Sequence, residues 1–175
     1  QMLQAAGLDP LTDEQRQADE DNPRGYFELE AATQLRDNPE WIMDAQGKVI
    51  KIVAQLIPWL PQGLSYRVIF MQRDIDEVLS SQRTMLERHG KQGSTLADDR
   101  MKNVFQRQLA QTREVLRQHQ IPTLAVSHGQ AIEDPGKVAA RVANFVGTDV
   151  DTQTLAAAID PQLYRQRKRK NDGPS

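Results

Sequence analysis

The sequence predicts an α/β fold in which helices flank a central parallel sheet. Three short runs, residues 49–53, 66–71 and 123–126, are rich in Val, Ile and Phe and lack strict polar alternation. Strands that are buried on both faces of a parallel sheet have this composition. Helical patterns lie between and after these runs, and an alternation of strands with helices favours parallel pairing.

The helical signals are apolar residues at spacings of three and four. They predict helices over residues 75–86, 105–116 and 138–146, with Gly147 as a stop and Asp151 as the cap of a short fourth helix. The polar stretch between residues 90 and 99 is predicted to be a loop. Ligands of such sheets bind beyond the carboxyl ends of the strands, so residues that follow the three runs are the first candidates for chemistry.

The composition excludes several classes of function. A chain of 175 residues makes one domain, and its net charge of −2 indicates no general affinity for nucleic acid or membranes. The absence of cysteine excludes disulfides, thiol catalysis and thiolate metal sites, and the three histidines have no metal-ligand spacing. We therefore expect no metal. No apolar run is long enough to span a bilayer and no signal peptide is visible, so we expect a cytoplasmic protein.

The first residues predict the end of a helix rather than its beginning. Residues 1–6 have a helical pattern, and Gly7 stands where a helix stop is expected. We therefore expect that upstream sequence has been lost. On this interpretation, residues 1–175 form a single domain that is truncated at its N-terminus.

The most informative residues for chemistry follow the second predicted strand. The run at 66–71 leads into Arg73, and Ser81 lies about two turns along the helix that follows. A guanidinium can donate two parallel hydrogen bonds to a phosphate, and a nearby hydroxyl can donate a further one. The structural alternative is an Arg73 that pairs with Asp74 or Asp76.

This arrangement is similar to the 3′-phosphate-binding motif of sulfotransferases of the P-loop superfamily. In that motif an Arg at the end of a strand precedes a Ser by eight residues, as Arg73 precedes Ser81; Ser80 is the alternative. Four further blocks in the same order resemble a bacterial branch of the family: Asn22-Pro23-Arg24-Gly25-Tyr26-Phe27-Glu28, residues 47–53 with Leu60-Pro61, residues 132–147, and residues 160–165.

The resemblance covers nearly the whole chain and implies a fold, a donor and a reaction. The fold is the three-layer P-loop type, a central parallel sheet between helices, and the donor is 3′-phosphoadenosine 5′-phosphosulfate (PAPS). The family's phosphate loop, which cradles the 5′-phosphosulfate, should precede Gln1 together with the first strand. Both are absent from this sequence, so the resemblance predicts that the 175 residues alone bind PAPS weakly or not at all.

The resemblance also nominates two catalytic residues. Sulfuryl transfer needs a base for the acceptor and a cation for the departing oxygen. Family members place a Lys on the second strand; Lys51 matches it, although the His that cytosolic members carry two residues later is replaced by Val53. Other branches use a Glu after the first helix, which points to Glu28, with Glu30 as the alternative. A buried carboxylate has the raised pKa that a base needs. The structural alternatives are a capping acid at Glu28 and a lysine in an ion pair.

Three further residues are weighed on the same basis. Arg165 and Arg167 belong to a basic run that resembles the family's basic C-terminal loop, which closes over the 3′-phosphate; a solvated tail is the alternative. His128 ends the third predicted strand. At this point family members carry a structural Tyr, so we do not assign His128 to catalysis.

The sequence thus predicts a PAPS-dependent sulfotransferase that acts on a hydroxyl or amine of a small molecule, a carbohydrate or a peptide. Two alternatives stay open. A nucleotide or metabolite kinase has the same topology but needs a carboxylate for Mg²⁺ near a strand end, where only Asp74 is available. A non-catalytic nucleotide-binding or partner protein is the other. Neither the acceptor nor the oligomeric state can be inferred from the sequence.

Overall fold

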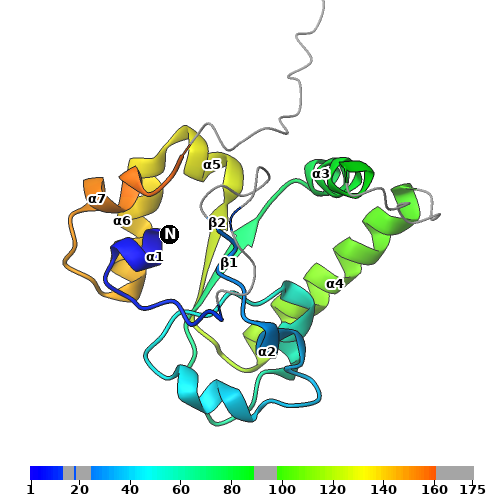
Figure 1. Cartoon of the computed structure of the whole chain (residues 1–175), viewed down its shortest axis with the longest axis horizontal. Coiled ribbons are helices and arrows are strands. Elements are labelled where there is room, and N and C mark those ends of the chain that lie inside the picture. Colours follow the sequence, from blue (N-terminus) through cyan, green and yellow to red (C-terminus); the bar gives the residue numbers. More distant parts are fainter. Residues whose placement is uncertain (14–17, 19–24, 89–97, 161–175) are drawn as a thin grey trace, which may run out of the picture.

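The computed structural model describes residues 1–13, 18, 25–88 and 98–160. These residues form a mixed α/β fold with a small parallel sheet and several helices (Figure 1). The elements in chain order are α1 (Met2–Ala5), α2 (Glu30–Thr33), the 3₁₀ helices η1 (Glu40–Ala45) and η2 (Ala54–Trp59), β1 (Val68–Gln72), α3 (Ile75–Arg88), α4 (Asp98–Gln118), β2 (Thr123–Ser127), α5 (His128–Glu133), α6 (Pro135–Val146) and α7 (Thr152–Ala157).

The sheet consists of β1 and β2, which pair in parallel as the sequence predicts. Their register runs from Val68 opposite Thr123 to Gln72 opposite Ser127. The two strands therefore end side by side, and residues 73 and 128 leave the same edge of the sheet. The long connection between them contains α3 and α4, which extend away from the sheet in Figure 1.

Helices pack against both faces of this sheet. On one face Val126 is buried with Val138 and Val142 of α6, and half-buried side chains of α1 pack against the same cluster. On the other face Phe70 is buried with Leu116 of α4 and Ile57 of η2. Burial on both faces explains why the two strand sequences lack strict polar alternation.

The predicted strand over residues 49–53 does not form, and this prediction was wrong. Its one bridge joins Val49 to Pro10, with Val49 N–H donating to the Asp9 carbonyl at 2.8 Å. Ile50 and Ile52 are half-buried, whereas Lys51 and Val53 are exposed. Over residues 50–53, burial therefore alternates as it does in a strand. Apolar composition predicted which side chains would be buried, but a strand also needs a neighbouring backbone along its length. After Val53 the chain turns into η2.

The predicted helices are present, and local chemistry explains where they end. The Asp134 side chain accepts from Lys137 N–H at 3.0 Å, and Pro135 occupies the first position of α6, where it loses no helical hydrogen bond. Gly147 has a φ of 74° just past α6, a left-handed conformation that glycine adopts without a steric cost. Gly7, with a φ of 79°, follows α1 in the same way. Asp151 precedes α7, but its side chain makes no capping hydrogen bond.

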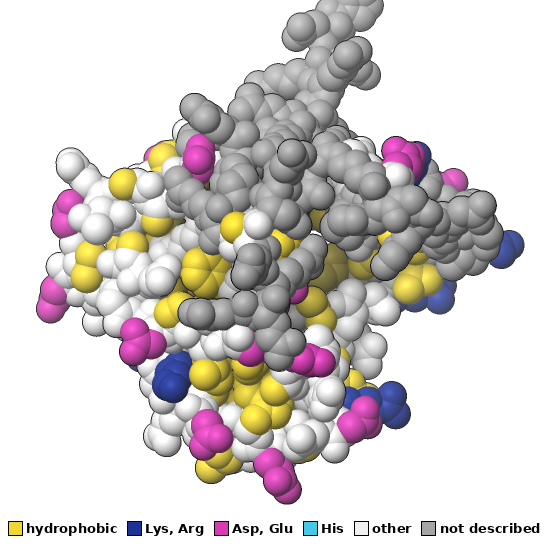
Figure 2. All heavy atoms as spheres, viewed as in Figure 1, with side chains coloured by type: hydrophobic (Ala, Val, Ile, Leu, Met, Phe, Trp, Pro, Cys, Tyr) yellow, Lys and Arg dark blue, Asp and Glu magenta, His cyan; other side chains and the backbone are white. Residues whose placement is uncertain are grey.

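The lower part of the molecule in Figure 1 is an irregular region with its own core. Leu35, Ile42 and Ala45 are its buried members, and half-buried apolar side chains surround them. Other apolar side chains gather on its surface (Figure 2), where Met43 and Trp59 are among the exposed large hydrophobic residues. Within the described ranges, no helix combines the length and the apolar character needed to cross a membrane.

Candidate functional site

The structure brings together Glu28 and Lys51, which the resemblance nominated separately as base and cation. Lys51 Nζ lies 3.0 Å from Glu28 Oε1 and donates a second hydrogen bond of 3.2 Å to the Tyr26 carbonyl. Both side chains come from irregular segments that are 23 residues apart in sequence. An ammonium and a carboxylate therefore meet at one point of the surface.

The backbone around Phe27 positions both partners of Lys51. Phe27 has a φ of 48°, the left-handed region that a bulky residue seldom adopts. It stands between Tyr26, whose carbonyl binds Lys51, and Glu28, whose carboxylate binds Lys51. The Thr12 hydroxyl donates to the Glu28 carbonyl at 3.0 Å and holds the far side of this turn. Strained backbone of this kind is concentrated at functional sites, where the surrounding structure maintains it.

The ion pair is half exposed, which differs from what the sequence led us to expect. The side chain of Lys51 is 50% exposed and that of Glu28 is 43% exposed. The sequence argument required a buried Glu28, whose pKa burial would raise. The structure provides instead a solvent-accessible carboxylate beside a cation. Exposed ion pairs contribute about 0–1 kcal/mol to stability, so this pair costs little to open.

Arg73 lies at the edge where β1 ends, as predicted. Its Nε is 3.4 Å from Glu77 Oε2, one turn into α3, and the two side chains are only 28% and 10% exposed. Of the two acids named as structural alternatives, Asp74 accepts from Asp76 N–H at 2.9 Å, and Asp76 pairs with Lys102 of α4 at 2.8 Å. Sequence reasoning missed Glu77, although its spacing of four residues from Arg73 is the usual one for such a pair.

Ser81 and Ser80 occupy different surfaces of α3. Ser81 is half-buried, whereas Ser80 is exposed. The helix begins at Ile75, so Ser81 lies about two turns from the strand end, as the sequence predicted. Arg165 and Arg167 lie outside the described residues, as does most of the predicted loop between residues 90 and 99.

His128 begins α5 at the same edge as Arg73. The side chain is half-buried, and its Nδ1 atom is shielded from solvent. Burial lowers the pKa of His128 below its ordinary value of 6.5, the positive charge of Arg73 lowers it further, and the charge of Glu77 raises it. Arg73, Glu77 and His128 therefore form one electrostatic cluster, which we call the strand-end cluster.

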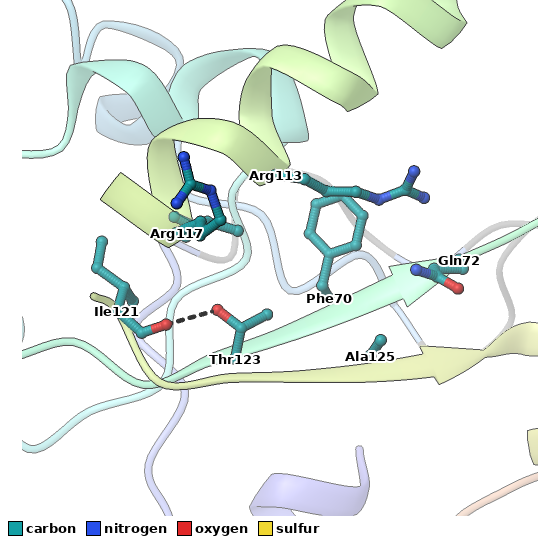
Figure 3. Close-up of a pocket in the computed structure, with 8 residues that line it drawn as sticks. Phe70, Gln72, Arg113, Arg117, Ile121, Thr123 and Ala125 are labelled. Atoms are coloured by element: carbon teal, nitrogen blue, oxygen red, sulfur yellow. Dashed lines mark hydrogen bonds between the residues drawn. The ribbon is translucent and has the colours of Figure 1, made fainter. Parts of the chain in front are cut away.

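Two shallow hollows lie on the α4 side of the sheet. The first, of about 210 Å³, lies between α4 and the strands and is lined by Phe70, Gln72, Thr123 and Ala125 (Figure 3). Arg113 reaches over the Phe70 ring at 5.7 Å from its centroid, a cation–π contact. The second, of about 230 Å³, lies between η2 and the end of α4. Neither hollow is lined by Glu28, Lys51, Arg73 or Ser81, so the candidate site residues lie outside both.

Comparisons with protein-family models, with curated proteins and with solved structures gave no match. Among the described residues there is no group of three or more histidine or acidic side chains that could hold a metal ion.

Proposed function

We propose that this chain belongs to a PAPS-dependent sulfotransferase that acts on a hydroxyl or amine acceptor. The observation that supports the proposal is the contact between Glu28 and Lys51 at 3.0 Å, which is also the ion pair named above as the structural alternative for Lys51, so the mutations described in the Discussion decide between the two. The sequence nominated the two residues separately, one as the base and one as the cation of the same reaction. Their charges meet although 23 residues separate them.

In the proposed reaction a Glu28 oxygen accepts the proton of the acceptor group. The acceptor atom forms a bond to sulfur while the bond between sulfur and the bridging phosphate oxygen breaks. Lys51 stabilises the negative charge that develops on that oxygen. In-line transfer needs the base and the cation on opposite sides of the sulfur, so the ion pair opens when the substrates bind. Its exposure makes this opening inexpensive.

Arg73 and Ser81 hold the 3′-phosphate of the donor in this proposal. Arg73 comes from the carboxyl edge of a parallel sheet, the edge at which α/β folds bind ligands. Arg165 and Arg167 close over the same phosphate. The proposal also includes the finer fold, the three-layer P-loop type. Helices on both faces of β1 and β2 support this arrangement.

The test is selectivity for the 3′-phosphate in the full-length gene product. Arg73→Ala should weaken binding of adenosine 3′,5′-bisphosphate by about 2–4 kcal/mol, on the scale of a lost charged pair. Ser81→Ala should weaken it by about 1–2 kcal/mol, and Ser80→Ala is the matched control with almost no effect. Adenosine 5′-monophosphate should bind weakly and change little. Isothermal titration of both nucleotides measures these differences.

The outcomes separate the alternatives. Equal losses for the two nucleotides would contradict the 3′-phosphate assignment. A kinase would show no dependence on the 3′ position, and a purely structural Arg73 would lose stability without selectivity. A large effect of Ser80→Ala with none of Ser81→Ala would move the hydroxyl contact by one residue.

A further inference from the structure

The parallel register places His128 beside Arg73. Gln72 and Ser127 are the last paired residues of β1 and β2, so Arg73 and His128 are the next residue on each strand. The Ser127 hydroxyl accepts from Gln130 N–H at 3.4 Å and thereby fixes the first turn of α5, where His128 stands. Two adjacent strand ends therefore present a guanidinium and an imidazole at one edge.

The surroundings of His128 lower its pKa and so favour the uncharged imidazole. Partial burial is the main reason for its lowered pKa, and the charge of Arg73 adds to it. Within the described ranges the charged side chains whose fields act on the imidazole are Arg73, which follows β1, and Glu77, in the first turn of α3. Glu77 acts in the opposite direction and favours the protonated form.

We propose that His128 joins Arg73 in binding the 3′-phosphate, so that affinity for the nucleotide increases when the imidazole is protonated. This inference rests on the proposed function, because it adds a residue to the same phosphate site. It concerns binding and assigns His128 no part in the transfer of the sulfuryl group.

The coupling follows from the charges of the strand-end cluster. A bound phosphate neutralises Arg73 and brings negative charge close to the imidazole. Both changes favour the imidazolium, so binding should raise the pKa of His128. By linkage, the protonated protein must then bind the phosphate more tightly than the neutral one. The long contact between Arg73 Nε and Glu77 Oε2, at 3.4 Å, is the interaction that the phosphate weakens.

The experiment compares the full-length wild type with His128→Gln, which removes the titrating group but keeps a polar side chain. Affinity for adenosine 3′,5′-bisphosphate is measured from about pH 7.5 to about pH 5.5, where histidine titrates. Protonation of the phosphate itself affects both proteins equally. The ratio of wild-type to variant affinity should increase several-fold, up to about tenfold, as the pH falls. His119→Gln, at an exposed histidine, is the matched control and should behave as the wild type.

A second variant tests the cluster without changing His128. Glu77→Gln removes the charge that favours the imidazolium, so the pH at which affinity increases should move downward. The pKa of His128, followed by nuclear magnetic resonance (NMR), should fall in the same variant. If the nucleotide binds with Arg73-dependent selectivity but the pH profiles of wild type and His128→Gln coincide, this inference is wrong and the proposed function stands. If selectivity for the 3′-phosphate is absent, both fail.

Discussion

The two halves of the proposed site are built in different ways. Arg73 and His128 lie where two paired strands end, and α3 and α5 begin almost at once. Glu28 and Lys51 lie in the irregular region between residues 25 and 60, which contains only a single helical turn and two 3₁₀ helices. The first half is positioned by backbone hydrogen bonds, and the second by a separate apolar core under η1 and η2.

The comparison shows what holds a functional residue in place without regular structure. In the irregular region, side chains bind distant backbone atoms. The Thr112 hydroxyl of α4, which is 1% exposed, donates to the Ala54 carbonyl at 2.9 Å and ties η2 to α4. Ile52, next to Lys51, packs against the cluster that contains Phe70 of β1. The segment that carries Lys51 is thus fixed against the sheet although it is not part of it.

The largest expected effect distinguishes a catalytic ion pair from a structural one in the irregular region. In the full-length gene product, Glu28→Gln should reduce turnover of PAPS by about 10²–10⁴-fold, the usual range for a proton-transfer group. Lys51→Met should reduce it by about 10²–10³-fold, the range for the loss of one group that stabilises developing charge. Unfolding free energy should change by no more than about 1 kcal/mol, because the pair is half exposed. Glu30→Gln is the control for Glu28. Unchanged turnover in folded variants would make the pair purely structural.

A second prediction compares the cores of the two regions. Leu35 in the irregular region and Leu155 of α7 are both 0% exposed. Truncation of either to Ala should reduce the unfolding free energy by about 2–5 kcal/mol, because a cavity remains where the side chain was packed. Urea denaturation of both variants measures the difference. A loss below about 1 kcal/mol for Leu35→Ala alone would show that the irregular region is loosely packed and does not fix Lys51.

The smallest expected effect is the pH dependence of stability that the titration of His128 causes. It belongs to the strand ends, because residues 25–60 contain no histidine. The pKa of His128 is lowered in the folded state by burial and by Arg73, from an ordinary value of 6.5. The unfolded chain therefore binds its proton first as the pH falls. Stability from this group is complete above pH 6.5 and is lost as the pH falls toward the folded-state pKa.

Thermal unfolding as a function of pH tests this effect. His128→Gln should flatten the profile just below pH 6.5. Identical profiles for wild type and His128→Gln would contradict the assigned environment of the imidazole.

The regular half of the fold could be predicted from the sequence, and the irregular half could not. The spacing of the apolar residues and the stop at Gly147 predict α6, because both are preferences of the local sequence. The left-handed backbone at Phe27 has no local sequence signal, because a bulky side chain disfavours that conformation. Residues 49–53 were assigned to a strand because apolar composition predicts burial but not the presence of a pairing partner.

The candidate site shows the same division. Glu28 and Lys51 were nominated by a family resemblance, and their contact depends on a chain path that no periodicity encodes. Glu77 could have been found from its spacing to Arg73. The proximity of His128 to Arg73 required the strand register, which the sequence does not specify.

The central claim, that both regions serve one nucleotide, is tested most directly by an NMR titration of the full-length protein with adenosine 3′,5′-bisphosphate. Signals of Arg73 and Ser81 report the 3′-phosphate, and the Lys51 ammonium reports the 5′ side. We expect both sets of signals to shift with the same Kd, and Arg73→Ala to weaken both together. A response confined to one region, or two different Kd values, would contradict a single site.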